Sequence, residues 1–218
     1  ADHRQELMEQ AWQHGGHTFL GIFSDLMVNQ SANDQVADFV RDRIEGARSC
    51  LFDLQRLCSY GHFRLSSQMM LVRELLSGLG EAHSAFVTTL MLQRAGVNAR
   101  FIDLSGWRDE SECSLEERIA GGLRDLDLAS ELPIVTGYAQ CCEGLMREYD
   151  RGYSEVTFSS IAAYTKAKEA IIHKEFHLSS ADPNLVGQDA VRKLGRTNYD
   201  VADQLSNMGM EAIHPRAG

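Results

Sequence analysis

Apolar residues recur at helical spacing through most of the first 95 residues. A run of apolar side chains with a 3.6-residue period predicts one helix between Asn33 and Gly61. A second helix is predicted from Ser66 to Gly78, and a third from Gly80 to Arg94. Residues 1–30 are also predicted to be helical, with a break at Gly15-Gly16. The first part of the chain is therefore expected to be almost entirely helical.

The pattern changes after Val97, where short apolar runs alternate with helical segments. This alternation is typical of βαβ units and predicts a largely parallel sheet. Helices are predicted near 115–126, after the polar turn at Asp150, and over 199–208. Strands are predicted at 97–104, 132–137, 169–173 and 211–213.

Composition and charge narrow the classes of protein that fit this pattern. The 218 residues are 44% hydrophobic and 24% charged, as in an ordinary folded domain. The formal net charge of -10 argues against nucleic acid or an anionic membrane surface as the main partner. No apolar run approaches the roughly 18 residues that span a bilayer, and Ala1 to Gln10 do not resemble a signal peptide. The five cysteines form no C-x-x-C pair, which favours reduced thiols and a cytoplasmic location over a disulfide framework.

A polar turn, Asp150-Arg151-Gly152, precedes Ser154 and an apolar helical run. Ser154 is predicted to be the N-cap of that helix. Free backbone N–H groups and the helix dipole favour anions at such a terminus, and the Arg151 guanidinium matches a carboxylate or phosphate. A solvated arginine on a turn is the simpler alternative. Asp150 and Glu155 are either helix-start acids or groups that bind magnesium or position the reacting groups.

Two further segments carry polar groups at positions where ligands bind. Glu81, in the first turn of its predicted helix, is either a capping acid or a carboxylate that meets a substrate amine. The predicted strand ending at His173 runs through Lys174 into the loop 179–184, at the carboxyl edge of the sheet. His173 and His177 lack partners at zinc-ligand spacing, so no protein metal site is predicted.

Five segments, in this order, resemble the aspartokinases of the amino acid kinase family. They are Gly78-Leu-Gly-Glu-Ala-His-Ser-Ala85, Val135-Thr-Gly-Tyr138, Asp150-Arg-Gly-Tyr-Ser-Glu155, Ser179-Ser-Ala-Asp-Pro-Asn184 and Met208-Gly-Met-Glu-Ala-Ile-His-Pro215. Each segment alone is a weak match, but five in register are specific. The residues of the third segment, and those from His173 to Pro183, are similar to the sequence of the divergent aspartokinase that accompanies ectoine biosynthesis.

This resemblance implies a three-layer α/β/α fold with a mostly parallel sheet. Residues 1–218 would form a partial catalytic domain, with 1–95 as its mainly helical part and 96–218 as its nucleotide- and substrate-binding part. The amino-terminal Lys-x-Gly-Gly strand and the carboxyl-terminal ACT domains of the family are absent from this sequence. We therefore expect little turnover from these residues alone, and we expect self-association into a homo-oligomer through exposed sheet edges.

The resemblance further implies transfer of the γ-phosphoryl group of ATP, with Mg²⁺, to L-aspartate, giving 4-phospho-L-aspartate and ADP. It implies catalytic roles for Arg151 and Glu155, with Arg151 on the substrate carboxylate and Glu81 on its ammonium. Ser84 and Thr136 are the other implied substrate residues. The implied nucleotide-binding residues are His173, Lys174, Ser179, Asp182, Pro183, Asn184 and Glu211.

Three departures from the family pattern bear on activity. Tyr153 stands where the pattern has glycine, Glu155 where it has aspartate, and Glu211 where it has a lysine near ATP. Lys174 is a candidate to supply the missing cation. The alternatives that remain open are a non-catalytic ligand-binding pseudokinase, another family member with a different carboxylate or phosphate substrate, and a helical assembly module.

Overall fold

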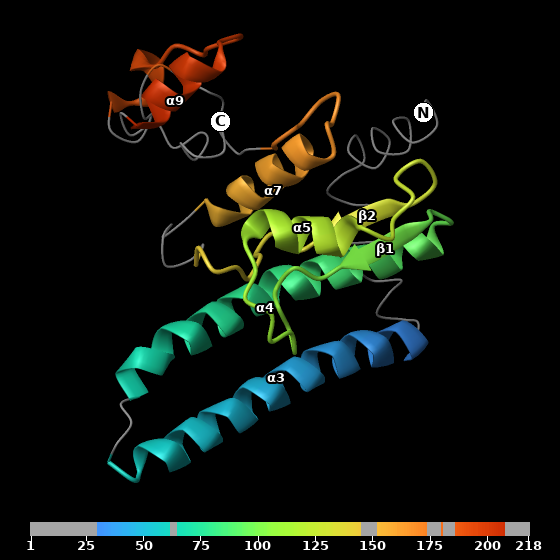
Figure 1. The fold of residues 1–218 in the computed structure, drawn as a ribbon. Coiled ribbons are helices and arrows are strands. Elements are labelled where there is room, and N and C mark those ends of the chain that lie inside the picture. Colours follow the sequence, from blue (N-terminus) through green and yellow to red (C-terminus); the bar gives the residue numbers. More distant parts are fainter. Residues whose placement is uncertain (1–29, 62–64, 145–151, 174–179, 181–185, 208–218) are drawn as a thin grey trace. The chain divides into compact units, whose positions relative to one another are not determined.

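The computed structural model describes residues 30–61, 65–144, 152–173, 180 and 186–207 (Figure 1). The chain divides into two compact units, each assembled from separate stretches of sequence. The first unit comprises residues 1–72, 83–101 and 127–134, and the second comprises residues 73–82, 102–126 and 135–218. Each unit is described below on its own.

Two long helices, α3 (Gln30–Cys58) and α4 (Leu65–Arg94), account for most of the described residues before β1. The helix predicted between Asn33 and Gly61 is confirmed, and Gly61 follows it with a φ of 75°. The prediction of two helices separated near Gly78 and Gly80 is wrong, because α4 passes through both glycines without a break. A glycine inside a helix costs only about 1 kcal/mol relative to alanine, which the strong helix formers around it offset.

An aromatic cluster forms the core of the first unit. Phe39 of α3 stacks on Phe86 of α4 with ring centroids 4.3 Å apart, and Phe101 meets both rings edge-on at 5.7 and 5.4 Å. The guanidinium of Arg43, which is 7% exposed, lies 4.2 Å from the centre of the Phe39 ring. The Phe39–Phe86 stack therefore joins α3 to the second half of α4, and a cation–π contact within α3 accommodates the buried arginine.

Two strands, β1 (Ala99–Ile102) and β2 (Leu132–Val135), pair in one sheet. The amide of Leu132 donates to the carbonyl of Asn98, and four residues further on the amide of Thr136 donates to the carbonyl of Ile102. Both partners advance in the same direction, so the strands are parallel, as the alternating pattern predicted. The expected α/β class with a parallel sheet is thereby confirmed, although both strands are shorter than predicted.

The second unit has its core between the strand ends and two helices, α5 (Leu115–Leu123) and α7 (Tyr153–Tyr164), which pack together (Figure 1). Ser114 and Glu117 form a capping box that fixes the start of α5, close to the predicted position. Side chains from the strand ends and both helices fill the space between them. The buried members are Ile102, Leu104, Leu115, Ile119, Leu123, Ala139, Cys141 and Val156.

The later part of the chain only partly matches the sequence pattern. The helix predicted at 199–208 is confirmed as α9 (Tyr199–Asn207), and a short 3-10 helix, η1 (Gln188–Ala190), precedes it. The strand predicted at 169–173 is wrong: these residues form no strand, and Ile171 is 59% exposed. A strand needs a neighbour for its backbone hydrogen bonds, and apolar sequence alone does not supply one. The strand predicted at 211–213 and the helix at 1–30, except its last residue, lie outside the described residues.

Over the part of the chain that the structure describes, no helix is long and apolar enough to cross a membrane.

The two glycines of α4 make a matched pair for a stability test. A Cβ at Gly78 would lie 2.6 Å from Cδ1 of the Tyr138 ring, whereas a Cβ at Gly80 would meet nothing within 4 Å. We expect Gly80→Ala to stabilise the fold by about 0.5 to 1 kcal/mol, the usual gain from alanine in a helix. We expect Gly78→Ala to destabilise it, because the buried Tyr138 ring must shift. Urea denaturation of both variants measures this, and equal effects would contradict the packing described here.

Candidate functional site

The carboxylate of Glu81 lies at the centre of the candidate site. One oxygen, Oε1, accepts a hydrogen bond of 2.7 Å from the hydroxyl of Ser154. The other, Oε2, is buried and has no hydrogen-bond partner among the described residues. A buried carboxylate oxygen without a partner is costly, so this atom favours a donor supplied by a ligand.

Gly137, which follows β2, shapes the space beside this oxygen. A Cβ at Gly137 would lie 2.6 Å from Oε2 of Glu81 and 3.0 Å from the Ser154 side chain. Any other residue would push the carboxylate or the start of α7 aside. Glycine is therefore required at this position by close approach rather than by an unusual backbone angle.

The start of α7 differs from the sequence-based prediction. Ser154 was predicted to be the N-cap, but the N-cap is Gly152, with a φ of 85° and no side-chain capping bond. The Ser154 hydroxyl bonds to Glu81 instead, 73 residues earlier in the chain. Glu155 lies half-buried in the first turn of α7, where a carboxylate is favoured by the helix dipole.

Two tyrosines form an aromatic pair in the second unit. Tyr138 and Tyr153 meet edge-to-face with ring centroids 5.9 Å apart and an interplanar angle of 87°. The Tyr138 hydroxyl donates to Glu74 at 3.4 Å, and burial, reinforced by the charge of Glu74, raises the pKa of Tyr138. Burial and the neighbouring Glu81 raise the pKa of Tyr153 to about 12. Both phenols are therefore protonated hydrogen-bond donors at neutral pH.

The remaining predicted substrate residues have different environments. Thr136 is 1% exposed, and its Oγ1 accepts from the amide of Leu104 and donates to the carbonyl of Tyr138. Its hydroxyl thus holds the strand ends together and sets the path of the chain into Gly137. Ser84, three residues after Glu81 on α4, is exposed. Their proposed contacts with substrate remain predictions.

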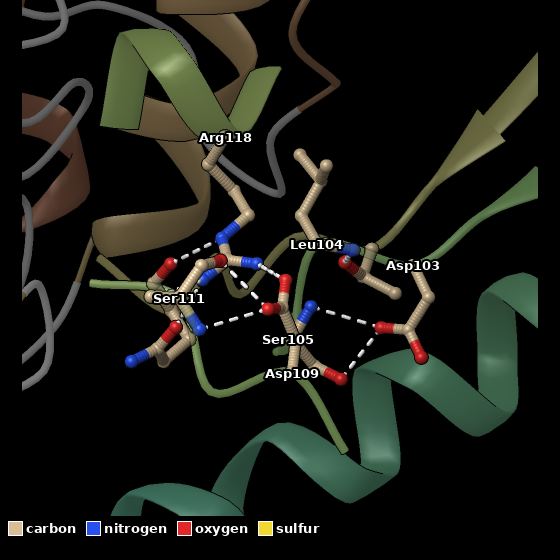
Figure 2. A network of polar contacts seen from close by, with 8 residues as sticks. Asp103, Leu104, Ser105, Asp109, Ser111 and Arg118 are labelled. Carbon is tan, nitrogen blue, oxygen red and sulfur yellow. Dashed lines mark hydrogen bonds and ion pairs between the residues drawn. The ribbon is translucent and has the colours of Figure 1, made fainter. Parts of the chain in front are cut away.

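The path of the chain after Tyr138 depends on one buried cation, Arg118 of α5, which is 7% exposed (Figure 2). Its Nε donates to the carbonyl of Gln140 at 2.8 Å, and its Nη2 donates to the Gln140 side chain and, at 3.1 Å, to the carbonyl of Ser111. Its Nη1 pairs with Asp109. One side chain therefore connects the loop after β1 with the segment after β2.

The loop after β1 is also stabilised locally (Figure 2). The amide and hydroxyl of Ser105 both donate to Asp103, and those of Ser111 both donate to Asp109. Such Asx-type turns satisfy backbone groups that no strand pairs. The loop therefore presents Asp109 to Arg118 in a defined position.

The structure thus brings Glu81 and Ser154 into contact and places Gly137 beside the carboxylate, with Glu155 in the same helical turn as Ser154. Sequence reasoning singled out Glu81, Ser154 and Glu155 but missed the roles of Gly137 and Arg118. The Thr-Gly step after an apolar strand was the available signal for Gly137, whereas an arginine inside an amphipathic helix gives no signal of burial. His173 lies in the coil after α7. The other predicted site residues, Arg151, Lys174, Ser179, Asp182, Pro183, Asn184 and Glu211, lie outside the described residues.

No group of three or more His, Cys, Asp or Glu side chains that could hold a metal ion occurs within the described ranges.

In the second unit, the start of α7 adjoins the Glu81 carboxylate, whose Oε2 is buried without a partner among the described residues. The family model described as the amino acid kinase family matches residues 14–217. The chain therefore belongs to the amino acid kinase family.

Comparison with curated proteins points to one branch of that family. The chain is 62% identical over 179 residues to the protein named aspartate kinase Ask_Ect of Stutzerimonas stutzeri (strain A1501), a match covering 82% of this chain and 38% of the relative. It is 30% identical over 153 residues to the aspartokinase of Schizosaccharomyces pombe, covering 66% of this chain and 29% of the relative. It is also 30% identical over 158 residues to aspartokinase 2 of Bacillus subtilis (strain 168), covering 66% of this chain and 36% of the relative.

The matches therefore span less than two fifths of the length of these relatives. No solved structure gave a significant match.

The Asp109 carboxylate makes the second unit sensitive to acid. Hydrogen bonds from the Ser111 hydroxyl and amide, followed by Arg118, lower the pKa of Asp109 from 3.8 to about 2. Because the folded pKa lies below the ordinary value, the ionised carboxylate stabilises the fold above about pH 4, and this contribution is lost as the pH falls toward 2. We expect Asp109→Asn to lower the urea midpoint at pH 7 and to reduce its fall between pH 4 and pH 2.5.

The matched control is Glu110→Gln, which removes an exposed carboxylate one residue away. It should leave the pH dependence of the urea midpoint as in the wild type. An Asp109→Asn midpoint that falls with acid as steeply as the wild-type midpoint would contradict the assignment.

Proposed function

We propose that this chain forms part of an aspartate kinase, which transfers the γ-phosphoryl group of ATP to the β-carboxylate of L-aspartate in the supply of aspartate semialdehyde for ectoine. The observation that carries the proposal is the buried, unpartnered Oε2 of Glu81 beside Gly137. A small amino acid supplies the donor that this oxygen lacks. The 62% identity to a protein named aspartate kinase Ask_Ect supports both the acceptor and the pathway.

Glu81 would bind the ammonium group of aspartate through Oε2. Ser154 already holds Oε1 at 2.7 Å, so the carboxylate is oriented before the substrate arrives. This preorganisation reduces the ordering cost of binding. Thr136 would act by keeping Gly137 close to Glu81. Ser84, on the same helix as Glu81, would contact the substrate.

The carboxylate end of the substrate would be held by Arg151 and the free amides at the start of α7. Glu155, in the same helical turn, would orient the reacting carboxylate. One β-carboxylate oxygen forms a bond to the γ-phosphorus as the bond from that phosphorus to the β,γ-bridging oxygen breaks, and ADP leaves with the electron pair. Catalysis of this kind rests on positioning and charge neutralisation rather than on a covalent intermediate.

ATP supplies the phosphoryl group, and Mg²⁺ would neutralise its charge. We propose His173, Lys174, Ser179, Asp182, Pro183, Asn184 and Glu211 as the residues that hold the nucleotide, with Lys174 as the cation. We also propose a cytoplasmic homo-oligomer. Exposed apolar side chains on α3, among them Ile44, Phe52 and Leu57, support self-association, which light scattering would measure.

The direct test of the function uses the full-length product of the gene that encodes this chain. We expect ATP- and L-aspartate-dependent formation of an acyl phosphate, trapped as the hydroxamate with hydroxylamine. Binding of ATP and aspartate without formation of hydroxamate would indicate a pseudokinase. This alternative is suggested by Tyr153 in place of the glycine of the family pattern and by Glu211 in place of its lysine. Turnover with a different carboxylate acceptor would indicate another specificity within the family.

The proposed role of Glu81 predicts a selective loss of aspartate binding. Glu81→Gln keeps the size of the side chain but removes the charge that pairs with the ammonium. We expect the KM for aspartate to rise about 100-fold, the usual scale for breaking a buried charge pair, while the KM for ATP stays within about twofold. Steady-state kinetics of the full-length protein measure both constants.

Glu116→Gln, which neutralises an exposed glutamate on α5, is the matched control and should leave both constants unchanged. A Glu81→Gln variant with a normal KM for aspartate would show that the substrate ammonium binds elsewhere.

A further inference from the structure

We propose that Cys113 and Cys142 form a reversible disulfide when the protein meets a disulfide oxidant such as oxidised glutathione, and that this bond stabilises the second unit. Both cysteines are free thiols in the structure, and both belong to that unit. The pair is a thiol modification site apart from the Glu81 carboxylate. The inference therefore goes beyond the proposed function and does not depend on kinase activity.

The first step concerns how close the two residues lie. The amide of Cys142 donates to the carbonyl of Cys113 at 2.9 Å. Standard backbone dimensions then keep the two Cα atoms within about 7 Å of each other. Disulfides usually join Cα atoms about 4.4 to 6.8 Å apart, and a wider separation requires the backbone to move. The two backbones therefore already lie within the span of a disulfide.

The second step concerns what holds the two backbones in this register. Cys113 comes directly before Ser114, the N-cap of α5. Glu143, directly after Cys142, accepts hydrogen bonds from the amide of Leu115 with both carboxylate oxygens at 3.1 Å. The contact between the cysteines is thus followed by a second contact between the same two segments. Such fixed positions favour reaction between two groups, because little entropy is lost when they meet.

The third step concerns access to the thiols. Cys142 is exposed and Cys113 is half-buried, so a small oxidant reaches the pair. Cys141, in contrast, is 7% exposed and belongs to the hydrophobic core of the second unit. A bridge between the adjacent Cys141 and Cys142 would also depart from the usual disulfide geometry and carry strain. Cys113 is therefore the better partner for Cys142.

The fourth step concerns the chemistry of the exchange. A Cys113 thiolate attacks one sulfur of oxidised glutathione, displaces one glutathione thiolate and becomes bonded to the other glutathione. The Cys142 thiol already donates to the Glu143 carboxylate at 3.5 Å, which can accept its proton. The Cys142 sulfur then attacks the Cys113 sulfur and breaks its bond to glutathione. The displaced thiolates take up the two released protons, so two cysteines are oxidised and one glutathione disulfide is reduced.

The environment of Cys142 also accounts for its reduced form in the absence of an oxidant. Desolvation, followed by the hydrogen bond to Glu143, raises the pKa of Cys142. The thiol, which is less reactive than the thiolate, is therefore the resting form at neutral pH. Once formed, the disulfide would link the loop after β1 to the segment after β2, which Arg118 joins only by hydrogen bonds and an ion pair.

Peptide mapping of the full-length protein tests the bond directly. After incubation with oxidised glutathione, free thiols are alkylated and the protein is digested with trypsin without reduction. Cleavage after arginine places Cys113 in peptide 109–118 and Cys142 in peptide 125–147. We expect mass spectrometry to find these two peptides linked, and dithiothreitol to separate them. The oxidised protein should melt about 5 °C above the reduced protein, because the bond constrains the unfolded chain.

Three variants assign the bond to its two sulfurs. Cys113→Ser and Cys142→Ser should each lose the linked peptides and the difference in melting temperature. Cys50→Ser, which removes an exposed thiol of α3, is the matched control and should keep both.

The wild-type protein alone can overturn the proposal, even if a serine variant does not fold. Unlinked peptides, or cysteines that each retain a glutathione, would show that the two thiols do not pair. Linked peptides that persist in Cys142→Ser would assign the bond to Cys141 instead. A link that leaves the melting temperature unchanged would overturn its stabilising role.

Discussion

The guanidinium of Arg118 is the interaction on which the geometry of the second unit depends. Few groups can hold two loops at once, and a buried arginine does so only if its donors are satisfied. Here they reach Asp109, Ser111 and Gln140, so the loop after β1 and the segment after β2 are fixed to the same atoms. Gly137, which adjoins Glu81, precedes Gln140 by three positions, and its placement follows from that anchor.

Close packing at two glycines then determines the surroundings of the Glu81 carboxylate and the Tyr138 ring. Gly78 admits the Tyr138 ring and Gly137 admits the Glu81 carboxylate, each with no room for a Cβ. The result is a carboxylate with one oxygen held by Ser154 and the other enclosed without a partner. A buried polar atom without a partner requires an explanation, and the proposed binding of the substrate ammonium rests on this oxygen.

Local sequence signals predicted the elements well where neighbours in the chain decide the structure. The helix up to Gly61, the capping box of α5 and the positions of β1 and β2 all follow from period, caps and turn residues. The predictions failed where a distant partner decides. Gly78 and Gly80 resemble a helix break, yet α4 continues through both, and Gly78 is where the distant Tyr138 ring packs against the helix. Residues 169–173 resemble a strand, yet an apolar run forms one only beside another strand.

The sequence by itself determined the α/β class, the candidate carboxylate Glu81 and the loop before α7, because these depend on residue type and short-range spacing. Only the tertiary structure decided that Ser154 holds Glu81 rather than capping its own helix, that Gly137 lies against the same carboxylate, and that Arg118 anchors the segment after it. The physical reason is that the residue type fixes which hydrogen bonds a side chain can make. Which partner it meets depends on the packing of segments that are far apart in the chain.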